Sequence, residues 1–420
     1  MRLSLTSRTF RAICALLCLW MLCAVPPGMA AQTPGTIEIA GETVALDETR
    51  LTLGFSDIPD LTPLTRLTQL EELMLMYAGL GDLSPLGELP SLQSLLIIGC
   101  TLNDPDSVAA CAGVRNLCLA NCALTRLPPM AGFRQLTKLS IANNPIVDLS
   151  PLSDLPQLKE LYANGCSIQG LDALKGLSAL EVLNLSENRL TELGPLAGLT
   201  ALRELDLSQN QFISNLDHLV PLAEMTDLAL LWLDGNDIAD LSPLSGMESL
   251  TELSLNNNRI DDISPLSSMT NLTTLWLCEN HIQDIAPLSS LTKLTHLYLY
   301  ENQIMDVAPL AALPALEELH LQSNVIEDAT ALANLDSLTY LSLSGNRIVD
   351  VSPLSSLRSL VYLILTDNQV RDITVLAGVS TLAYLEVVGN DGIDPVQAEW
   401  LQQQLPRCAV VLIDEDEHGC

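Results

Sequence analysis

The sequence predicts an α/β solenoid, with a curved parallel β-sheet on its concave side and short 3-10 or helical turns on its convex side. Three observations predict this fold class. One frame of apolar and polar residues recurs about fifteen times, at a nearly constant period of 22 residues. Each frame contains apolar residues at alternate positions, which is typical of a short strand. Most frames end on an acidic residue, a small residue, proline and leucine, which is a typical start of a helical turn.

The repeat unit is clearest in the segment 272–288. Its recurring positions are Leu272, Leu275, Leu277, Asn280, Ile282, Ile285 and Leu288. The asparagine position, called the Asn slot below, is also filled by Asn144, Asn188, Asn210, Asn236, Asn258, Asn302, Asn324, Asn346, Asn368 and Asn390, and in earlier repeats by Ala78, Cys100, Cys122 and Cys166. The step from Asn210 to Asn236 is 26 residues instead of 22, so one repeat carries a four-residue insertion within residues 211–220.

Each part of the repeat has a physical reason. Leu275 and Leu277 lie on the same face of a strand and therefore point inward, while the strands of successive repeats pair in parallel. The amide of Asn280 can satisfy backbone groups where the chain turns away from the strand. Asp284 and its equivalents suit the start of a helical turn. The alternative for this acidic column is a calcium site, although one Asp per repeat gives no clustered cage.

The frame L-x-x-L-x-L-x-x-N/C-x-L resembles the leucine-rich-repeat family and covers about 310 of the roughly 390 residues after position 30. Its 22-residue length and the tail Asp284-Ile285-Ala286-Pro287-Leu288 resemble the internalins of bacterial surfaces. The resemblance implies a bacterial surface or secreted protein that engages a protein ligand through its concave face. Repeats of a eukaryotic phosphatase-regulating subunit share this subtype, which implies a regulatory or inhibitory subunit as an alternative. The sequence departs from the internalin pattern in that no immunoglobulin-like domain or wall-attachment signal is seen after the repeats, so a released binder, an inhibitor and a subunit of a larger assembly are the alternatives expected.

The first thirty residues are expected to be an export signal. Arg2, Arg8 and Arg11 precede a short apolar run over residues 12–25, and Gly28-Met29-Ala30 offers a cleavage pattern. The apolar run is shorter than a membrane span requires, so no stable membrane insertion is expected. The mature protein is therefore expected to be secreted or held at the cell surface.

The remaining chain divides into caps and repeats. The expected segments are 31–55 for an N-terminal cap and a degenerate first repeat, 56–393 for about fifteen repeats, and 394–420 for a C-terminal cap and acidic tail. Residues 36–45 are expected to form a small β element that seals the first repeat. The C-terminal cap is expected to contain a helix over residues 396–405, with Trp400 in its core, and a strand over residues 409–413.

The charge of the chain restricts its partners. The formal net charge is −32, and removal of the three arginines of the expected signal makes it −35. This charge argues against nucleic acid, which needs a basic face, and against anionic lipid. It serves the solubility of a long exposed surface, and it also favours a basic partner.

Eight cysteines follow the expected signal: Cys100, Cys111, Cys118, Cys122, Cys166, Cys278, Cys408 and Cys420. Those in the Asn slot are interpreted as small, buried, weak donors. Cys408 and Cys420 flank the last expected strand and are the best candidates for a disulfide, since export permits one. Pairing among Cys100, Cys111, Cys118 and Cys122 is a further possibility. Zinc is a weaker idea because the chain has no C-x-x-C pair.

Aromatic residues mark the expected concave face. Four positions of each repeat, which lie six, four, two and one residues before the Asn slot, should face solvent there. Nine of the ten Tyr and Trp residues after position 30 fall on these positions. Strand propensity explains part of this enrichment, but exposed aromatic rings also recur where a partner buries them. The candidate ligand-binding residues are Tyr162, Trp232, Trp276, Tyr298, Tyr300, His296, His320, Tyr340, Tyr362 and Tyr384.

The candidates form two expected columns across the strands. The first runs from Trp232 through Trp276 to Tyr298, and Tyr340, Tyr362 and Tyr384 form the second. Rings with interleaved acidic residues suit a protein or peptide ligand. They also suit a carbohydrate or cell-wall glycan, whose apolar faces stack on rings. No catalytic set, metal site or cofactor is indicated, because Cys278 and the two histidines lie in different columns.

Overall fold

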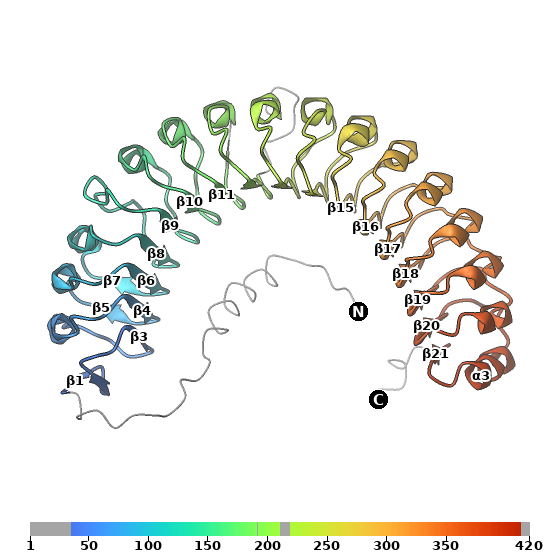
Figure 1. The fold of residues 1–420 in the computed structure, drawn as a ribbon, viewed down its shortest axis with the longest axis horizontal. Helices are drawn as coiled ribbons and strands as arrows, with labels where there is room; N and C mark the ends of the chain where they lie inside the picture. The colour runs from blue at the N-terminus through green and yellow to red at the C-terminus, as the bar shows by residue number, and fades with distance from the viewer. Residues whose placement is uncertain (1–34, 191, 211–218, 413–420) are drawn as a thin grey trace.

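In the computed structural model, which describes residues 35–190, 192–210 and 219–412, the repeats stack into an open arc. The strands line the inner side of the arc and the 3-10 turns line its outer side (Figure 1). The first repeats and the C-terminal cap lie at its opposite ends. The predicted fold class, with the sheet on the concave side, is therefore confirmed.

One parallel sheet of 17 strands runs through the arc. Its strands are Arg50–Gly54 (β3), Glu72–Met76 (β4), Ser94–Ile98 (β6), Asn116–Ala120 (β8), Lys138–Ser140 (β9), Glu160–Tyr162 (β10), Val182–Asn184 (β11), Glu204–Asp206 (β12), Leu230–Trp232 (β13), Glu252–Ser254 (β14), Thr274–Trp276 (β15), His296–Tyr298 (β16), Glu318–His320 (β17), Tyr340–Ser342 (β18), Tyr362–Ile364 (β19), Tyr384–Glu386 (β20) and Ala409–Val411 (β21). Gly79–Leu80 (β5) and Thr101–Leu102 (β7) pair beside it. Leu275 pairs with Leu297, one 22-residue repeat away, whereas Leu205 pairs with Leu231, 26 residues away. The insertion that causes this longer step falls mainly on residues 211–218, outside the described residues.

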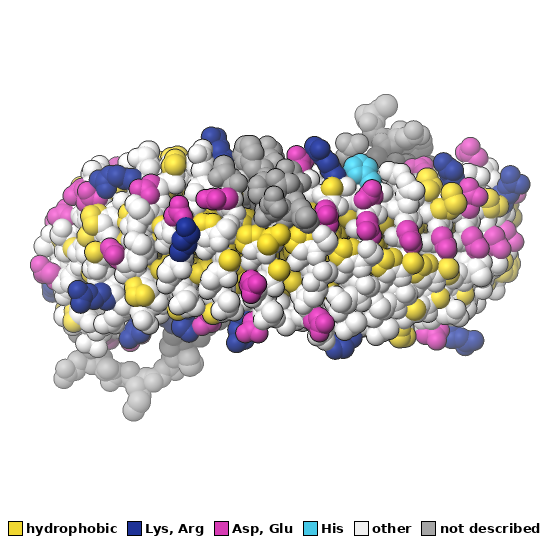
Figure 2. Space-filling model, turned by 90° about the horizontal axis from the view of Figure 1, so that it is seen from above, with side chains coloured by type: hydrophobic (Ala, Val, Ile, Leu, Met, Phe, Trp, Pro, Cys, Tyr) yellow, Lys and Arg dark blue, Asp and Glu magenta, His cyan; other side chains and the backbone are white. Residues whose placement is uncertain are grey.

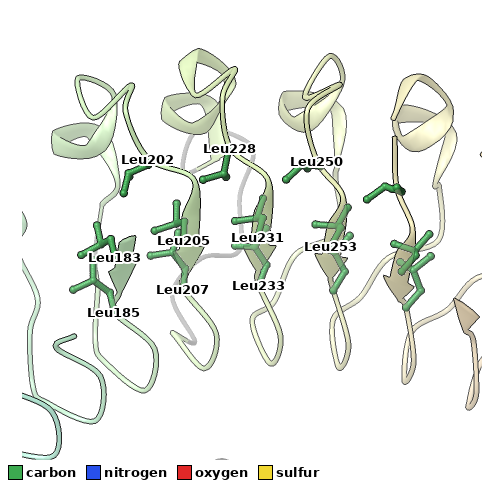
Figure 3. Close-up of a cluster of buried hydrophobic side chains, with 14 of the residues drawn as sticks. Leu183, Leu185, Leu202, Leu205, Leu207, Leu228, Leu231, Leu233, Leu250 and Leu253 are labelled. Atoms are coloured by element: carbon green, nitrogen blue, oxygen red, sulfur yellow. The ribbon is translucent and has the colours of Figure 1, made fainter. Parts of the chain in front are cut away.

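The interior of the arc is a continuous column of leucine side chains. Figure 3 shows Leu183, Leu205 and Leu231 pointing from successive strands into the space between the sheet and the outer turns. Each of these three side chains is at most 1% exposed. Because strand residues alternate between two faces, the residues on either side of each inward leucine point to the concave surface.

The Asn slot closes the turn after each strand. The Asn280 Nδ2 atom donates to Leu277 O at 3.2 Å in its own repeat and to Leu255 O at 2.9 Å in the preceding one. Its Oδ1 atom accepts from the backbone N–H of Ile260 at 3.0 Å. The amide therefore satisfies buried backbone groups of two neighbouring repeats, as the sequence predicts.

Cysteines in the Asn slot make the weaker version of the same contacts. The Sγ atom of Cys100 donates to Leu75 O at 3.4 Å, and that of Cys122 donates to Ile97 O at 3.4 Å. Cys100, Cys111 and Cys122 form no disulfide, and burial raises the pKa of the Cys111 and Cys122 thiols to about 12. Pairing among these cysteines and Cys118 is therefore a wrong expectation: the three thiols are buried singly, and those of Cys100 and Cys122 serve the Asn slot as donors. The Cys408 thiol is buried, and its expected partner Cys420 lies outside the described residues.

The outer side of the arc consists of short 3-10 helices. They are Thr62–Arg66 (η1), Ser84–Glu88 (η2), Pro105–Cys111 (η3), Ser150–Asp154 (η4), Asp172–Leu174 (η5), Gly194–Leu196 (η6), Val220–Glu224 (η7), Ser242–Leu244 (η8), Ser264–Ser268 (η9), Ala286–Ser290 (η10), Ala308–Ala312 (η11), Thr330–Asn334 (η12), Ser352–Ser356 (η13) and Thr374–Gly378 (η14). Asp284 Oδ1 accepts from the N–H of Ala286 at 2.8 Å, and Asp82 and Ser84 repeat this contact at 2.9 Å. The hydrogen bonds from Ser84 lower the pKa of Asp82. Figure 2, seen from the convex side, shows a row of acidic side chains across the repeats in the right-hand part of the view.

Both ends of the arc are capped. At the N-terminal end, Thr36–Ile39 (β1) and Glu42–Ala45 (β2) form an antiparallel hairpin whose apolar side chains join the interior. At the other end, the helix Pro395–Gln404 (α3) begins at Asp394, whose side chain accepts from the N–H of Val396. The strand β21 then pairs with β20. Among the described residues, no helix is long and apolar enough to cross a membrane.

The expectation that Trp400 fills the core of the C-terminal cap is wrong. Leu401 and Leu405 lie four residues apart, are 0% and 6% exposed, and set the buried face of the cap. Trp400 is 41% exposed and shares the outer face of α3 with Val396, which is 65% exposed. The neighbouring position on a helix points about 100° away from the buried one, so Trp400 cannot share the face of Leu401.

Replacement of the slot asparagine should destabilise the stack. We expect Asn280→Ala to lower the free energy of unfolding by about 2–4 kcal/mol, because it leaves buried carbonyl and N–H groups without partners. Asn280→Cys should cost less, since the thiol retains a donor. Thermal denaturation followed by circular dichroism compares the two variants. Equal melting temperatures for the alanine variant and the unmodified protein would show that water replaces the amide at no cost.

Candidate functional site

The concave surface is built from the strand residues that flank each inward leucine. In β16, Leu297 is fully buried, whereas His296 and Tyr298 on either side of it remain partly exposed. The residue directly before the Asn slot adopts the left-handed conformation in most repeats, as Glu279 and Glu301 do with φ values of 57° and 55°. All ten candidate residues lie on this surface, and none of them is in the buried interior.

Six aromatic rings stand side by side on six consecutive strands, β15 to β20. We call Trp276, Tyr298, His320, Tyr340, Tyr362 and Tyr384 the ring ladder. The centroid distances from ring to ring, in this order, are 5.7, 4.6, 4.7, 6.1 and 6.3 Å. The two columns read from the sequence are therefore one continuous row. The two columns join between His320 and Tyr340. These two residues stand at different positions within their repeats, so the sheet does not pair them directly.

The rings of the ladder differ in how closely they stack. From Trp276 to Tyr340 the planes of neighbouring rings are 12–25° apart, so each ring covers the face of the next. From Tyr340 to Tyr384 the planes are tilted by 35–40°, and Tyr362 is 47% exposed. The first part of the ladder therefore presents ring edges to solvent, while the second part is more open.

Glu318 is the polar centre of the ladder. Its Oε1 atom accepts from Tyr298 Oη at 3.0 Å and lies 2.7 Å from His320 Nε2. His296 Nε2 lies 3.9 Å from the second oxygen. Burial lowers the pKa of His320, although the hydrogen bond and charge of Glu318 act in the opposite direction. Burial first, and the charge of Glu318 second, raise the pKa of the Tyr298 hydroxyl.

The tautomer of His320 follows from these contacts. A neutral ring that donates from Nε2 to Glu318 has Nδ1 as an acceptor, and Gln322 Nε2 lies 3.0 Å from that atom. This orientation leaves Gln322 Oε1 buried without a hydrogen-bond partner among the described residues. Such an orphaned acceptor is uncommon in a folded protein, and here it belongs to the side chain that contacts His320 of the ring ladder.

A second carboxylate is held at the far end of the ladder. Glu386 accepts from Tyr384 Oη at 2.8 Å through one oxygen and from Thr366 Oγ1 at 2.9 Å through the other. The sequence places acidic residues, Glu318 and Glu386 among them, between the rings. It did not reveal that phenol hydroxyls of the ladder hold them, because those contacts depend on side-chain directions.

The other candidates lie outside the ladder. Ser254 separates Trp232 from Trp276 in their shared column. Tyr162 lies on β10, where its hydroxyl donates to Glu160 Oε2 at 3.1 Å and Lys138 Nζ lies 5.0 Å from its ring. Tyr300 follows β16 at the position next to Cys278, and burial raises the pKa of its hydroxyl.

A separate aromatic pair, which the repeat pattern does not predict, lies near the N-terminal end of the arc. Phe55 is 78% exposed and stacks on Tyr77, with centroids 5.6 Å apart. Both residues hold the left-handed conformation, with φ values of 62° and 50°. Phe55 lies directly before Ser56, which takes the place of the slot asparagine in the degenerate first repeat. This position, one residue before the slot, is the only feature of the sequence that indicates an exposed ring here.

Two carboxylates sit in a polar stretch between the apolar N-terminal strands and the ladder. Asp234 Oδ1 accepts from Ser254 Oγ at 2.5 Å and from the N–H of Asn256 at 2.8 Å. Burial raises the pKa of Asp234 to about 6 and also raises the pKa of Asp206. Among the described residues, no three His, Cys, Asp or Glu side chains are grouped so that they could hold a metal ion.

Seven acidic residues occupy concave positions of β13 to β20 and of the turns that follow them. They are Asp234, Glu252, Glu279, Glu301, Glu318, Asp367 and Glu386. No Lys or Arg occupies a concave position in these repeats. The ring ladder is therefore surrounded by negative charge.

Comparison with known proteins agrees with this architecture. The family described as Leucine Rich repeats (2 copies) matches residues 134–176, 178–221, 226–268, 270–311, 292–334 and 336–378. The chain belongs to the leucine-rich-repeat family. No curated protein matches it, and no enzyme family is indicated among the comparisons.

Solved structures place the leucine-rich-repeat chain near the internalins. An internalin (InlF) from Listeria monocytogenes is 31% identical, with a TM-score of 0.67, over 77% of this chain and 87% of that one. A leucine-rich-repeat protein of Leptospira interrogans is 24% identical, with a TM-score of 0.70, over 86% of this chain and 100% of that one. The ectodomain of the Arabidopsis receptor kinase HAESA, in complex with a peptide hormone, is 23% identical, with a TM-score of 0.64, over 80% and 60%. The chain is thus an internalin-like leucine-rich-repeat protein.

The raised pKa of Asp234 makes a pH-dependent prediction. Its folded pKa of about 6 lies above the unfolded value of 3.8, so its contribution to stability is present below pH 3.8 and is lost as the pH rises through 6. Asp234→Asn should therefore raise the stability at pH 7.5, by about 1–2 kcal/mol, and leave it almost unchanged at pH 4. Melting temperatures at the two pH values measure this, with the exposed Asp227→Asn as control. A gain of the same size at both pH values would contradict the raised pKa.

Proposed function

We propose that this protein is an exported recognition module that holds a protein or peptide ligand on its concave face. The observation that carries the proposal is the ring ladder, with six aromatic rings on one exposed curved sheet. Large apolar side chains on a surface reduce solubility, and groups of them recur where a partner buries them.

The packing of the ladder supports this function energetically. Trp276, Tyr298 and His320 stack on their neighbours, so their rotamers are restricted before any ligand arrives. A binding surface that is already ordered loses less conformational entropy on association. Aromatic side chains also offer a large contact area with few rotatable bonds.

Proteins of the same fold hold peptides. The plant receptor RGFR1 was solved in complex with RGF2, and the HAESA ectodomain with an IDA peptide hormone. Both are under 25% identical to this chain, so they support the capacity of the fold and not a shared ligand. The ectodomain and internalin neighbours favour an extracellular or surface role, which agrees with export through residues 1–30.

The geometry favours a protein ligand over a glycan. A sugar that stacks on a ring needs an open ring face, but the rings from Trp276 to Tyr340 cover one another at interplanar angles of 12–25°. Open faces remain at the two ends of the ladder and around Tyr362. A glycan array is the direct test of this alternative, and a strong signal lost in Trp276→Ala would favour it.

The ladder can be tested by a variant with three substitutions. Tyr340→Ser, Tyr362→Ser and Tyr384→Ser together should weaken ligand binding by about 100-fold or more, because each aromatic anchor is typically worth 1–2 kcal/mol. Partners captured from extracellular protein fractions are identified by mass spectrometry, purified, and titrated against both forms.

A matched control removes apolar residues elsewhere on the surface. Val147→Ser, Met305→Ser and Val349→Ser replace exposed side chains that do not lie on the strands. This control should bind as the unmodified protein does. If the tyrosine variant and the control bind every purified partner equally, the ladder is not the binding site.

Export predicts a processed N-terminus. Expression of the whole chain in a bacterium should release a protein that begins near Ala31, because Gly28-Met29-Ala30 offers small residues at the cleavage positions. Intact mass spectrometry of the secreted protein measures this boundary. A chain that stays in the cell with residues 1–30 attached would contradict the proposed export.

A further inference from the structure

The ring ladder holds two carboxylates in fixed positions, and these indicate which charged groups the ligand carries. Glu318 receives hydrogen bonds from Tyr298 and His320, and Glu386 receives them from Tyr384 and Thr366. A surface glutamate usually samples many rotamers and loses this freedom when it pairs with a ligand. These two are already oriented, so an ion pair formed with either of them loses less entropy.

The separation of the two carboxylates is set by the sheet. Glu318 is on β17 and Glu386 is on β20, three strands further along. Parallel strands lie about 4.8 Å apart, which gives about 14 Å along the arc. Glu386 is also two residues further along its strand than Glu318, and this offset brings the distance between the Cα atoms to about 16 Å.

The surroundings of the two carboxylates favour cationic side chains. Among the described residues there is no group of three metal-ligating side chains. The concave positions of β13 to β20 carry seven carboxylates and no Lys or Arg. Because these carboxylates are distributed along the concave face, a ligand that neutralises them needs several separate positive charges. Lys or Arg side chains along a polypeptide provide such an arrangement.

Rings fill the space between the two carboxylates. Tyr340 and Tyr362 lie between Glu318 and Glu386, and their hydroxyls make no hydrogen bond to another described residue. This stretch can therefore pack against a ligand backbone and donate hydrogen bonds to its carbonyl groups. A segment laid here crosses the strands of the sheet, so it cannot pair with them as an added strand.

We propose that the ladder recognises an extended segment of the partner in which two Lys or Arg residues lie four positions apart, one at Glu318 and the other at Glu386. An extended chain rises about 3.4 Å per residue, so residues four apart are about 13.5 Å apart and point to the same face. Long cationic side chains span the remaining few ångströms. Residues three apart point to opposite faces. The inference rests on the proposed function, since it assumes that the ligand lies on the ladder.

Peptides of identical composition test the spacing. Three fluorescein-labelled peptides, each of eleven residues, carry two arginines in a background of serine, threonine and valine, at separations of one, three and four positions. Fluorescence anisotropy measures their binding to the full chain at low salt. The peptide with separation four should bind about fivefold tighter than the other two, which is the gain from one additional exposed ion pair.

Substitutions then assign the preference to the two carboxylates. Glu318→Gln with Glu386→Gln should abolish the spacing preference, while each glutamine keeps an oxygen for the phenol donor. Glu88→Gln with Glu248→Gln changes the net charge equally, at exposed positions off the concave face, and should retain the preference. Glu318 is bonded to two rings of the ladder, whereas Glu386 is bonded to one. Glu386→Gln alone therefore serves as the second variant, and it should reduce the affinity for the peptide with separation four to that for the other two peptides.

The outcomes separate this inference from the proposed function. Equal binding of the three peptides, or a preference that survives loss of both carboxylates, overturns the spacing rule. If the three-tyrosine variant nevertheless loses its purified partner, the ladder remains the binding surface and only the spacing rule is wrong. If that variant retains its partner, the proposed function itself is wrong.

Discussion

The structure depends on the burial of each repeat by its neighbours. A 22-residue coil has one apolar side and no partner within itself, so its leucines are buried only when another coil covers them. Leu275 and Leu297 are both fully buried because they pair across adjacent strands. The slot asparagines reinforce this stacking, since each amide binds backbone groups of two repeats. The hairpin β1–β2 and the segment α3–β21 cover the two coils that would otherwise be exposed at the ends.

The same constraint creates the binding surface. A fixed register places every residue beside its equivalent in the next repeat, so similar side chains on successive strands must meet. The rings at equivalent positions, from Trp276 to His320 and from Tyr340 to Tyr384, therefore lie side by side, and the direction of the His320 and Tyr340 side chains joins the two sets. A globular protein would need long-range folding to assemble six rings in a row. In this solenoid the strands of successive repeats already lie in a row, so aromatic residues at the concave positions of those strands are sufficient.

Charge and aromatic packing act together on this surface. The ladder orients Glu318 and Glu386 through phenol hydroxyls, and these carboxylates in turn orient His320 and Tyr384. Toward the N-terminal half, the partly buried Asp206 and Asp234 replace rings with a polar stretch in which burial raises the pKa of both carboxyl groups. Still nearer the N-terminus the concave face carries apolar side chains of β4 and β6. One continuous sheet therefore offers three chemically different sectors.

The sequence alone determined the repeat, the fold class, the strand register and the residues that face the concave side, because all of these follow from a period of 22 and the alternation of strands. It also located the helix of the C-terminal cap, which starts at Asp394 and Pro395. Only the tertiary structure decided how outward side chains lean. Those directions joined the column of His320 to that of Tyr340, closed the faces of the rings from Trp276 to Tyr340, and fixed Glu318. The tertiary structure also decided that Trp400 points outward, because Leu401 and Leu405 set which side of α3 is buried. The repeat pattern could not predict this, since it ends before the C-terminal cap.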